Sequence, residues 1–372
     1  MIRRLTIALS LLLCVSLFGS NDVTATSKGL GNKYVSAHEK STISKILTTE
    51  LDEVQAEAAI VVDVNTGQLL WQKNAREPLA PASMSKIMTM YLVLEAIEDG
   101  EINRDDVVTI SEEAVDTGGS TMFLQEGAEW TVKDLFVSMA LASANDASVA
   151  LAEHLASDEK SFVKKMNEKA AEFGLSSHAN FVNSHGLPQP KTREESTLTA
   201  YDTAMIGYHL IQDYPEVIEL TEKPQFTLSF SNQQFYNTNQ LLDRQVEIEQ
   251  LNDSLQQLED EEERQELEDQ LLLMDEGLQG MDGLKTGYTN RAGYSFIGTA
   301  ERGGQRLLSV VMKQIESISF SSNGDVIRSR VRSLYCRSSR CERLKSCQLF
   351  KTRAESMYST WIRLFILSRK IN

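Results

Sequence analysis

The sequence predicts an α+β fold, with one antiparallel sheet, flanking helices and a helical subdomain. β-prone segments lie at 58–72 and 284–312, near the two ends of the apolar part of the chain. Between them, apolar residues recur at helical spacing. Because strands from the two ends can pair with each other, we expect both ends of the domain to close one sheet, with helices packed on its faces.

Each element has its own signal. Two strands, at 58–64 and 68–72, flank the turn sequence Asn65-Thr66-Gly67, which is typical of a hairpin. A helix is expected after Pro81, because apolar residues keep one face from Met84 to Gly100. Further helices are predicted at 132–141, 146–155, 159–173 and 199–211. Strands return at 284–289, 294–299 and 306–312, and Arg302-Gly303-Gly304 forms the last turn.

The amino terminus has the features of an export signal. Arg3 and Arg4 precede an apolar run at 5–18, and small residues follow up to Ala25. We expect a signal peptide at 1–25 and a polar leader at 26–50. An uncleaved anchor is the alternative, although the run is shorter than a bilayer-spanning helix needs. Both interpretations place the protein outside the cytoplasm, either secreted or at the outer face of the membrane or in the cell wall.

Charge and cysteine content exclude several classes of function. The net charge of −16 argues against nucleic acid, because a phosphate backbone requires a basic face. Residues 313–372 hold 13 Lys and Arg against 4 Asp and Glu, which leaves +9 on this tail and −25 on the remainder. The tail also holds Cys336, Cys341 and Cys347, without the paired spacing of a zinc site. The five histidines form no metal-like group, so we expect neither metal nor cofactor.

Residues 243–279 interrupt the regular pattern. Leucines recur there among Glu, Asp and Gln, as in an acidic amphipathic helix or helical hairpin. The simplest interpretation is a solvated arm. A docking surface for a protein partner is the functional alternative.

Three short motifs follow one another along the chain. They are Ser83-Met84-Ser85-Lys86, Ser143-Ala144-Asn145 and Lys285-Thr286-Gly287. Each motif alone is weak evidence, because such short patterns recur by chance. The ordered set is much stronger, since class A β-lactamases and penicillin-binding proteins carry it.

The chain resembles the low-molecular-weight D-alanyl-D-alanine carboxypeptidases, a group of penicillin-binding proteins, over about residues 55–312. The resemblance rests on 81–89, 143–147, Phe181-Val182-Asn183 with Gly186-Leu187, and 282–289. It implies the fold shared by β-lactamases and DD-peptidases, with a catalytic domain at 51–312. It also implies removal of the terminal D-alanine from peptidoglycan stem peptides during cell-wall biogenesis, and inhibition by β-lactam antibiotics. Ala144 departs from the glycine often found there, and the likeness ends after Met312.

The first motif explains how a serine could become a nucleophile. A hydroxyl needs a neighbouring base, and residues three apart on a helix, such as Ser83 and Lys86, are neighbours. Lys86 can accept a proton only when it is neutral, and burial together with the nearby cation Lys285 would lower its pKa. Free N–H groups at the helix start would favour the oxyanion formed on attack.

The other motif residues would line the cleft. Ser143 would relay a proton to the leaving amine and Asn145 would hold the substrate amide, although both are also good helix-cap residues. Lys285 and Thr286 would bind the terminal carboxylate, while Gly287 leaves room for a peptide to add beside the strand. By resemblance, the backbone N–H of Tyr288 is the second oxyanion donor.

Alternatives remain open. A β-lactamase would discharge its acyl-enzyme through a glutamate-activated water, but no Glu-x-x-Leu-Asn follows Asn145. A catalytically impaired binding or scaffold protein is another alternative, because the tail at 313–372 lacks the helix and the arginine near the substrate carboxylate that the resemblance implies. This Ser- and Arg-rich tail is either aberrant or, at 361–367, a short basic helix for contact with a membrane surface.

Overall fold

The structure is a computed structural model that describes residues 54, 56–230, 234–243 and 280–314, together with the isolated positions 255 and 264. Several sequence predictions lie outside these residues: the signal peptide at 1–25, the leader at 26–50, nearly all of the acidic segment at 243–279, and the tail from 315 onward. The described residues all belong to one compact unit within 47–372.

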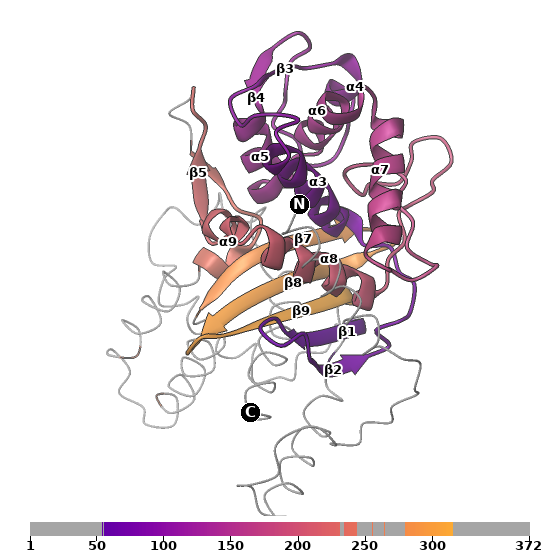
Figure 1. The fold of residues 1–372 in the computed structure, drawn as a ribbon, viewed down its shortest axis with the longest axis vertical. Coiled ribbons are helices and arrows are strands. Elements are labelled where there is room, and N and C mark those ends of the chain that lie inside the picture. The colour runs from indigo at the N-terminus through magenta and orange to yellow at the C-terminus, as the bar shows by residue number, and fades with distance from the viewer. Residues whose placement is uncertain are drawn as a thin grey trace, which may run out of the picture. The chain divides into compact units, whose positions relative to one another are not determined.

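Five strands of the described region form one antiparallel sheet in the order β2-β1-β9-β8-β7. The strands are β1 (Ala56–Asp63), β2 (Leu69–Lys73), β7 (Met281–Thr289), β8 (Gly293–Arg302) and β9 (Gln305–Gln314). β1 pairs with β9 from Ala56↔Gln314 to Asp63↔Leu307, so segments about 250 residues apart lie side by side (Figure 1). This confirms the predicted sheet, including the hairpin between β1 and β2. β9 continues two residues beyond its expected end.

The helices between the strands begin and end close to their predicted limits. α5 (Val132–Leu141), α6 (Asn145–Ala156), α7 (Glu159–Glu172) and α8 (Ala200–Asp213) correspond to the predicted segments. Thr199 caps α8 and forms a capping box with Asp202, which explains why this helix begins at Ala200. Shorter elements were not predicted: α4 (Glu112–Val115), α9 (Glu216–Thr221), η2 (Gln240–Asp243), and the ribbons β3 (Val107–Thr109) with β4 (Glu129–Thr131) and β5 (Gln225–Thr227) with β6 (Gln234–Tyr236).

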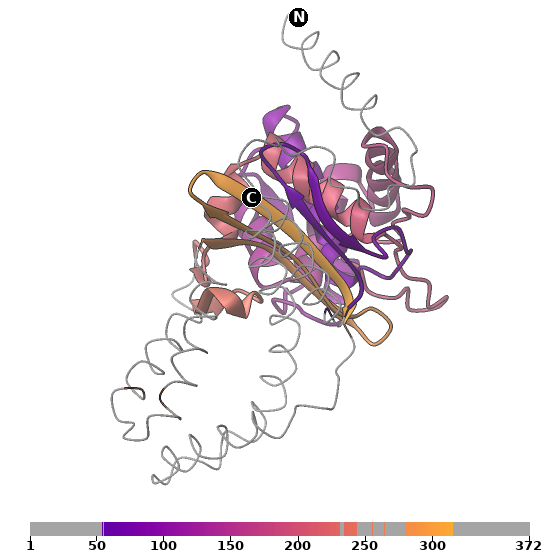
Figure 2. The same ribbon diagram turned by 90° about the horizontal axis from the view of Figure 1, so that it is seen from below.

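α8 joins the sheet to the remaining helices. It packs on β1, β8 and β9, and Figure 2 shows the indigo and orange strands running side by side along this sheet. Gly207 of α8 permits the close approach, because a Cβ there would lie 2.5 Å from Ile297 Cδ1. The main apolar core therefore lies between α8, the central helices and one face of the sheet.

α3 (Lys86–Glu98) differs from the expected helix with a single apolar face. Residues 86–94 are all buried, because α5, α6, α7 and α8 surround the helix. The expected start after Pro81 also needs correction, since a 3₁₀ turn, η1 (Ala82–Ser85), precedes α3. The opposite face of the sheet carries a second apolar cluster that includes Val61, Phe296 and Val311, each at most 1% exposed.

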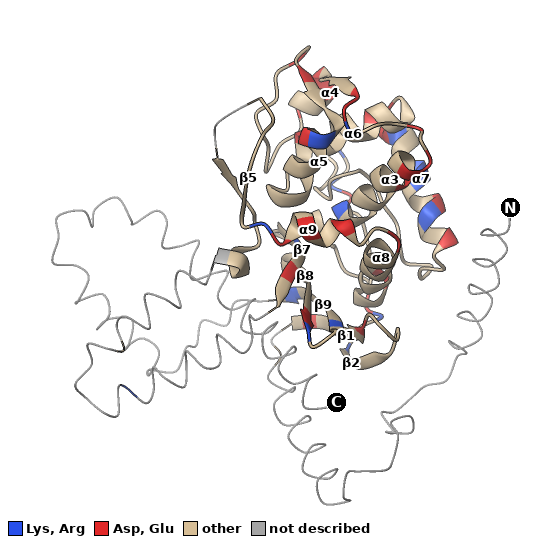
Figure 3. Ribbon diagram, turned by 60° about the vertical axis from the view of Figure 1, so that its left-hand side comes forward, with Lys and Arg blue, Asp and Glu red and all other residues tan. Residues whose placement is uncertain are grey.

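Acidic side chains mark the surface of the helical part. Figure 3 shows red segments on α4 and α9, where Glu112, Glu113, Glu216 and Glu219 lie. Among the residues that the structure describes, no helix combines the length and apolar character needed to cross a bilayer.

Candidate active site

The serine of the first motif lies on the 3₁₀ turn. In a 3₁₀ helix the side chains at i and i+3 lie almost directly above one another. This geometry places Lys86 Nζ, at the first residue of α3, 3.0 Å from Ser83 Oγ. Ala82 begins the turn with a left-handed φ of +50°, so the chain bends sharply just before the serine. The predicted pairing of Ser83 with Lys86 is therefore present, although not within an α-helix.

Lys86 is fully buried and contacts three oxygen atoms. It lies 3.0 Å from Ser83 Oγ, 2.6 Å from Asn145 Oδ1 and 2.9 Å from the backbone oxygen of His185. A neutral lysine has two N–H groups and one lone pair. Donation to Asn145 and His185 would use both N–H groups and leave the lone pair for the hydroxyl proton of Ser83.

Electrostatics favours this neutral form. Burial and the charge of Lys285 lower the pKa of Lys86 well below its usual value of 10.5, while Asp146 acts in the opposite direction. Burial also lowers the pKa of Lys285 to about 7. The neighbouring imidazole of His185 is neutral, because burial and Lys86 lower its pKa to about 3.

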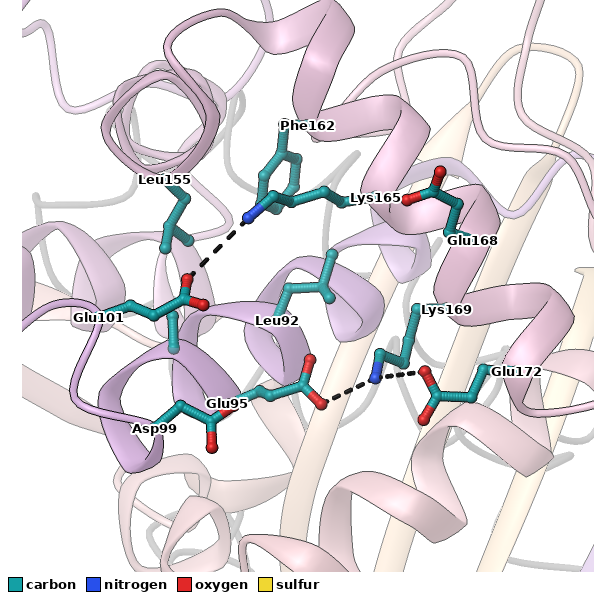
Figure 4. Close-up of a pocket in the computed structure, with 11 residues that line it drawn as sticks. Leu92, Glu95, Asp99, Glu101, Leu155, Phe162, Lys165, Glu168, Lys169 and Glu172 are labelled. Atoms are coloured by element: carbon teal, nitrogen blue, oxygen red, sulfur yellow. Dashed lines mark hydrogen bonds and ion pairs between the residues drawn. The ribbon is translucent and has the colours of Figure 1, made fainter.

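Lys169 provides an internal comparison. It is also buried, but two carboxylates contact its amine, Glu95 Oε1 and Glu172 Oε2, each at 2.7 Å (Figure 4). Burial would lower the pKa of Lys169, but the hydrogen bonds and charges of these two residues outweigh it, and the pKa is raised. Around Lys86, burial and the charge of Lys285 prevail, because the atoms in hydrogen-bond contact with its amine are neutral oxygens.

The second motif lies at the junction of α5 and α6. Asn145 is the first residue of α6, and Ala144 is the N-cap, without a side-chain capping bond. The Asn145 amide instead contacts Lys86 through Oδ1 and donates to the backbone oxygen of Gly118 at 2.7 Å. The helix-cap alternative is therefore wrong for Asn145. Ser143 is 5% exposed with φ +62°, and its hydroxyl is not among the oxygens that Lys86 contacts.

A loop before β4 fixes the position of Asn145. The backbone N–H of Asn145 donates to the backbone oxygen of Ser120 at 2.7 Å, while the Asp146 carboxylate accepts from the N–H groups of Met122 and Leu124. Asp146 thereby anchors the loop that carries Gly118. From the sequence, this aspartate was expected only at the start of the helix.

A second loop places the His185 oxygen beside Lys86. The Asn183 side chain accepts from the N–H of Gly186 at 2.6 Å and donates to the oxygen of Leu187 at 2.7 Å. Gly186 has φ +90°, and a Cβ there would clash with the backbone oxygen of Ala82. The sequence identified this glycine as part of the resemblance. It did not identify the His185 carbonyl oxygen, because a backbone atom has no residue signature.

β7 is one of the two edge strands of the sheet and brings the third motif to the serine. A Cβ on Gly287 would lie 2.8 Å from the oxygen of Pro81 and 3.2 Å from the N of Ser83, so only glycine allows this packing on η1. Lys285 is 1% exposed and Thr286 Oγ1 lies 2.8 Å from Thr238 Oγ1. Tyr288 is 49% exposed, with its ring 4.6 Å from that of Tyr294.

The three motifs therefore come together around η1. Lys86 contacts Ser83 and Asn145 directly, its pKa responds to Lys285, and Gly287 packs on the backbone of the turn. Within the described ranges, no three His, Cys, Asp or Glu side chains are grouped closely enough to hold a metal ion.

Comparisons with known proteins show the family of this chain. A family model described as D-alanyl-D-alanine carboxypeptidase (Peptidase_S11) matches residues 45–252 and 248–315. D-alanyl-D-alanine carboxypeptidase DacF from Bacillus subtilis is 37% identical over 267 residues, which cover 71% of this chain and 58% of that protein. The chain therefore spans less than two thirds of that relative.

Solved structures give the same result. Penicillin-binding protein D2 from Listeria monocytogenes, in its ampicillin-bound form, is 32% identical with a TM-score of 0.57, covering 71% of this chain and 91% of that one. Penicillin-binding protein 5 from Haemophilus influenzae is 31% identical with a TM-score of 0.57, covering 75% and 70%. Both likenesses support the predicted fold and relationship. The chain belongs to the D-alanyl-D-alanine carboxypeptidase family of serine peptidases, among the penicillin-binding proteins.

Proposed function

We propose that this protein is a serine-type D-Ala-D-Ala carboxypeptidase that removes the terminal D-alanine from peptidoglycan stem peptides through an acyl-enzyme on Ser83. The contact of 3.0 Å between Ser83 Oγ and the buried amine of Lys86, whose pKa is lowered, is the observation that carries this proposal. The family membership supports it. No cofactor enters the reaction.

Acylation begins when Lys86 takes the hydroxyl proton and Ser83 Oγ attacks the carbonyl carbon of the penultimate residue. The resulting oxyanion lies between the backbone N–H groups of Ser83 and Tyr288, which are on the two chain segments that Gly287 packs together. Ser143 passes the proton from Lys86 to the leaving amine, and the C–N bond breaks to release D-alanine. Water then hydrolyses the ester, with Lys86 again as the base.

Substrate binding uses residues of the second and third motifs. Lys285 and the Thr286 hydroxyl bind the terminal carboxylate, and Asn145 binds the amide of the peptide. β7 is an edge strand, so an extended peptide can pair along it as a further strand. A β-lactam antibiotic presents a carboxylate and a reactive amide in a similar arrangement, and it acylates the same serine.

Release of D-alanine tests the proposal. We expect the wild type to release D-alanine from a peptide that ends in D-Ala-D-Ala, and to leave the matching peptide ending in L-Ala-L-Ala intact. Ser83→Ala should abolish release while keeping the melting temperature. A folded wild type without release, or release that persists in Ser83→Ala, would contradict the assignment.

The contacts of Asp146 favour this function over a β-lactamase. Fast discharge of a penicilloyl-enzyme requires a carboxylate that activates water. The carboxylate that acts on Lys86 is Asp146, whose oxygens accept from the N–H groups of Met122, Leu124 and Ala147. These bonds use the carboxylate oxygens of Asp146 to hold backbone N–H groups, so we assign it a structural role and not the activation of water. Slow release of a penicilloyl group from the enzyme is therefore expected.

Location and further partners rest on the sequence. The export signal at 1–25 supports a secreted or surface-associated protein that meets peptidoglycan outside the cytoplasm. Two further proposals depend on the charge pattern alone: contact with a membrane surface through 361–367 and contact with a protein partner through 243–279. Fractionation of cells and capture by the isolated cell wall would test the location.

A further inference from the structure

Thr286 of the third motif shares a hydrogen bond with a threonine that lies outside the three motifs. The two hydroxyl oxygens, Thr286 Oγ1 and Thr238 Oγ1, lie 2.8 Å apart, and either hydroxyl can donate to the other at this distance. Both side chains are partly exposed, in contrast to the buried residues Lys285 and Gly287 on either side of Thr286. The pair is therefore accessible from solvent at the end of the site where Lys285 and Thr286 would bind a carboxylate.

Thr238 also contacts the helix that precedes the second motif. Its backbone N–H donates to the oxygen of Leu141 at 2.9 Å. Leu141 is the last residue of α5, two positions before Ser143. One residue thus bridges the segment that carries Ser143 and Asn145 to the strand that carries Lys285 and Thr286.

The turn around Thr238 is fixed by its two asparagine neighbours. Asn237 donates from its side chain to the oxygens of Thr221 and Lys223, at 3.1 and 3.0 Å, and accepts from the N–H of Asn239 at 2.9 Å. Thr221 in turn donates to the oxygen of Asp282, at the start of β7, at 2.8 Å. These bonds attach both the turn with Thr238 and the strand β7 to the segment of Thr221 and Lys223. The fold therefore sets the distance between the two hydroxyl groups.

The single proton of each hydroxyl decides whether Thr286 can also donate to a substrate carboxylate. A threonine hydroxyl has one proton to donate and two lone pairs that accept. If Thr286 donated to Thr238, it would have no proton left for a carboxylate. If Thr238 donates to Thr286, the proton of Thr286 remains available, and its oxygen is polarised by the bond that it accepts.

We propose that Thr238 is a positioning residue that donates its hydroxyl proton to Thr286 Oγ1 and so directs the Thr286 proton to the carboxylate of the substrate. This inference rests on the proposed function, since it names how the same site selects a substrate with a free carboxyl end. It assigns Thr238 to the selection of substrates rather than to the bond-breaking step.

A pair of thioester substrates tests the proposal. The two would share one D-alanyl acyl group and differ only in whether the leaving group ends in a carboxylate or a carboxamide. For Thr238→Val, which keeps the shape and removes the hydroxyl, we expect kcat/KM for the carboxylate substrate to fall about tenfold, the scale of a hydrogen bond to a charged group. The value for the carboxamide substrate should stay within about twofold, because a neutral end gains little from the directed proton.

Two further variants separate positioning from a structural effect. Thr238→Ser keeps the hydroxyl and should restore the preference for the carboxylate substrate. Thr227→Val removes an exposed hydroxyl from β5 and should change neither substrate. Both substrates are measured on the same preparation, so the ratio of the two kcat/KM values does not depend on how much of the protein is folded. Equal losses on both substrates in Thr238→Val, which leave the preference for the carboxylate unchanged, would therefore overturn the proposal even if this variant folds poorly. A wild type that turns over neither thioester would instead contradict the proposed function.

Discussion

Lys86 Nζ lies 2.6 Å from Asn145 Oδ1, the shortest of the three contacts that its amine makes. These residues are 59 positions apart and begin two different helices, α3 and α6. The neutral amide oxygen accepts an N–H of the lysine without adding a negative charge that would hold the proton on the amine. Asn145 therefore orients Lys86 and still permits it to be neutral.

Asn145→Asp should change the pH dependence of acylation. A carboxylate at this position would favour the charged form of Lys86 and raise its pKa, so less of the amine would be neutral at a given pH. We expect the acid limb of the penicillin acylation profile to move up by about one pH unit or more. Asn103→Asp adds the same charge on an exposed turn and should leave the limb in place. An acid limb that does not move in Asn145→Asp would argue against Lys86 as the base.

Lys86→Arg should remove the general base while keeping a positive charge. A guanidinium stays protonated over the accessible pH range, so it cannot accept the proton of Ser83. Penicillin acylation should fall about a hundredfold or more. Lys165→Arg, on the exposed side of α7, is the matched control and should acylate normally. Rapid acylation by a folded Lys86→Arg protein would exclude the proposed role.

Burial of Lys285 should appear as a pH dependence of stability. Its pKa is about 7 in the folded protein against a usual value of 10.5, so between these values the unfolded chain holds a proton that the folded chain lacks. Unfolding then takes up a proton, and stability rises with pH from about 7 toward 10. The urea midpoint of unfolding should rise less steeply with pH in Lys285→Met than in the wild type. Lys164→Met, at a side chain that is 79% exposed, should retain the wild-type slope, and parallel slopes in all three proteins would refute this account.

Gly287→Ala should open the gap between β7 and η1. The added methyl would meet backbone atoms of Pro81, Ser83 and Met84 at 2.8 to 3.2 Å, and backbone cannot move aside as a flexible side chain can. The N–H groups of Ser83 and Tyr288 would then be displaced from the oxyanion. We expect acylation to fall roughly tenfold to a hundredfold, as small misplacements in active sites do. The measurement is the second-order rate of penicillin labelling, and a rate equal to that of the wild type would show that the strand does not form the oxyanion site.

Periodicity and motif order predicted most of the fold. The 132–141 helix matches α5, and Thr199 with Asp202 marks the start of α8 in the sequence itself. The 3₁₀ turn at Ala82–Ser85 was not predicted, because the same apolar spacing continues into α3 and only the left-handed Ala82 interrupts it. The short ribbons β3–β4 and β5–β6 were missed because three-residue strands carry little periodicity.

The candidate site residues with distinctive side chains could be named from the sequence, and the backbone atoms that contact them could not. Ser83, Lys86, Asn145 and Lys285 are named by their motifs. The oxygens of His185 and Gly118 complete the contacts of Lys86 and Asn145, yet any residue type can supply a backbone oxygen. Thr238 was missed for a different reason, because its contact with Thr286 joins positions 48 apart and depends on the turn that Asn237 holds.

Intact mass after incubation with benzylpenicillin tests the central claim most directly, since it requires a folded cleft, an active nucleophile and slow deacylation. We predict one stable penicilloyl adduct on the wild type, located by peptide mapping at Ser83, and none on Ser83→Ala. An adduct that persists on Ser83→Ala and maps to another residue, or a folded wild type that gains no mass, would contradict the assignment of Ser83 as the nucleophile.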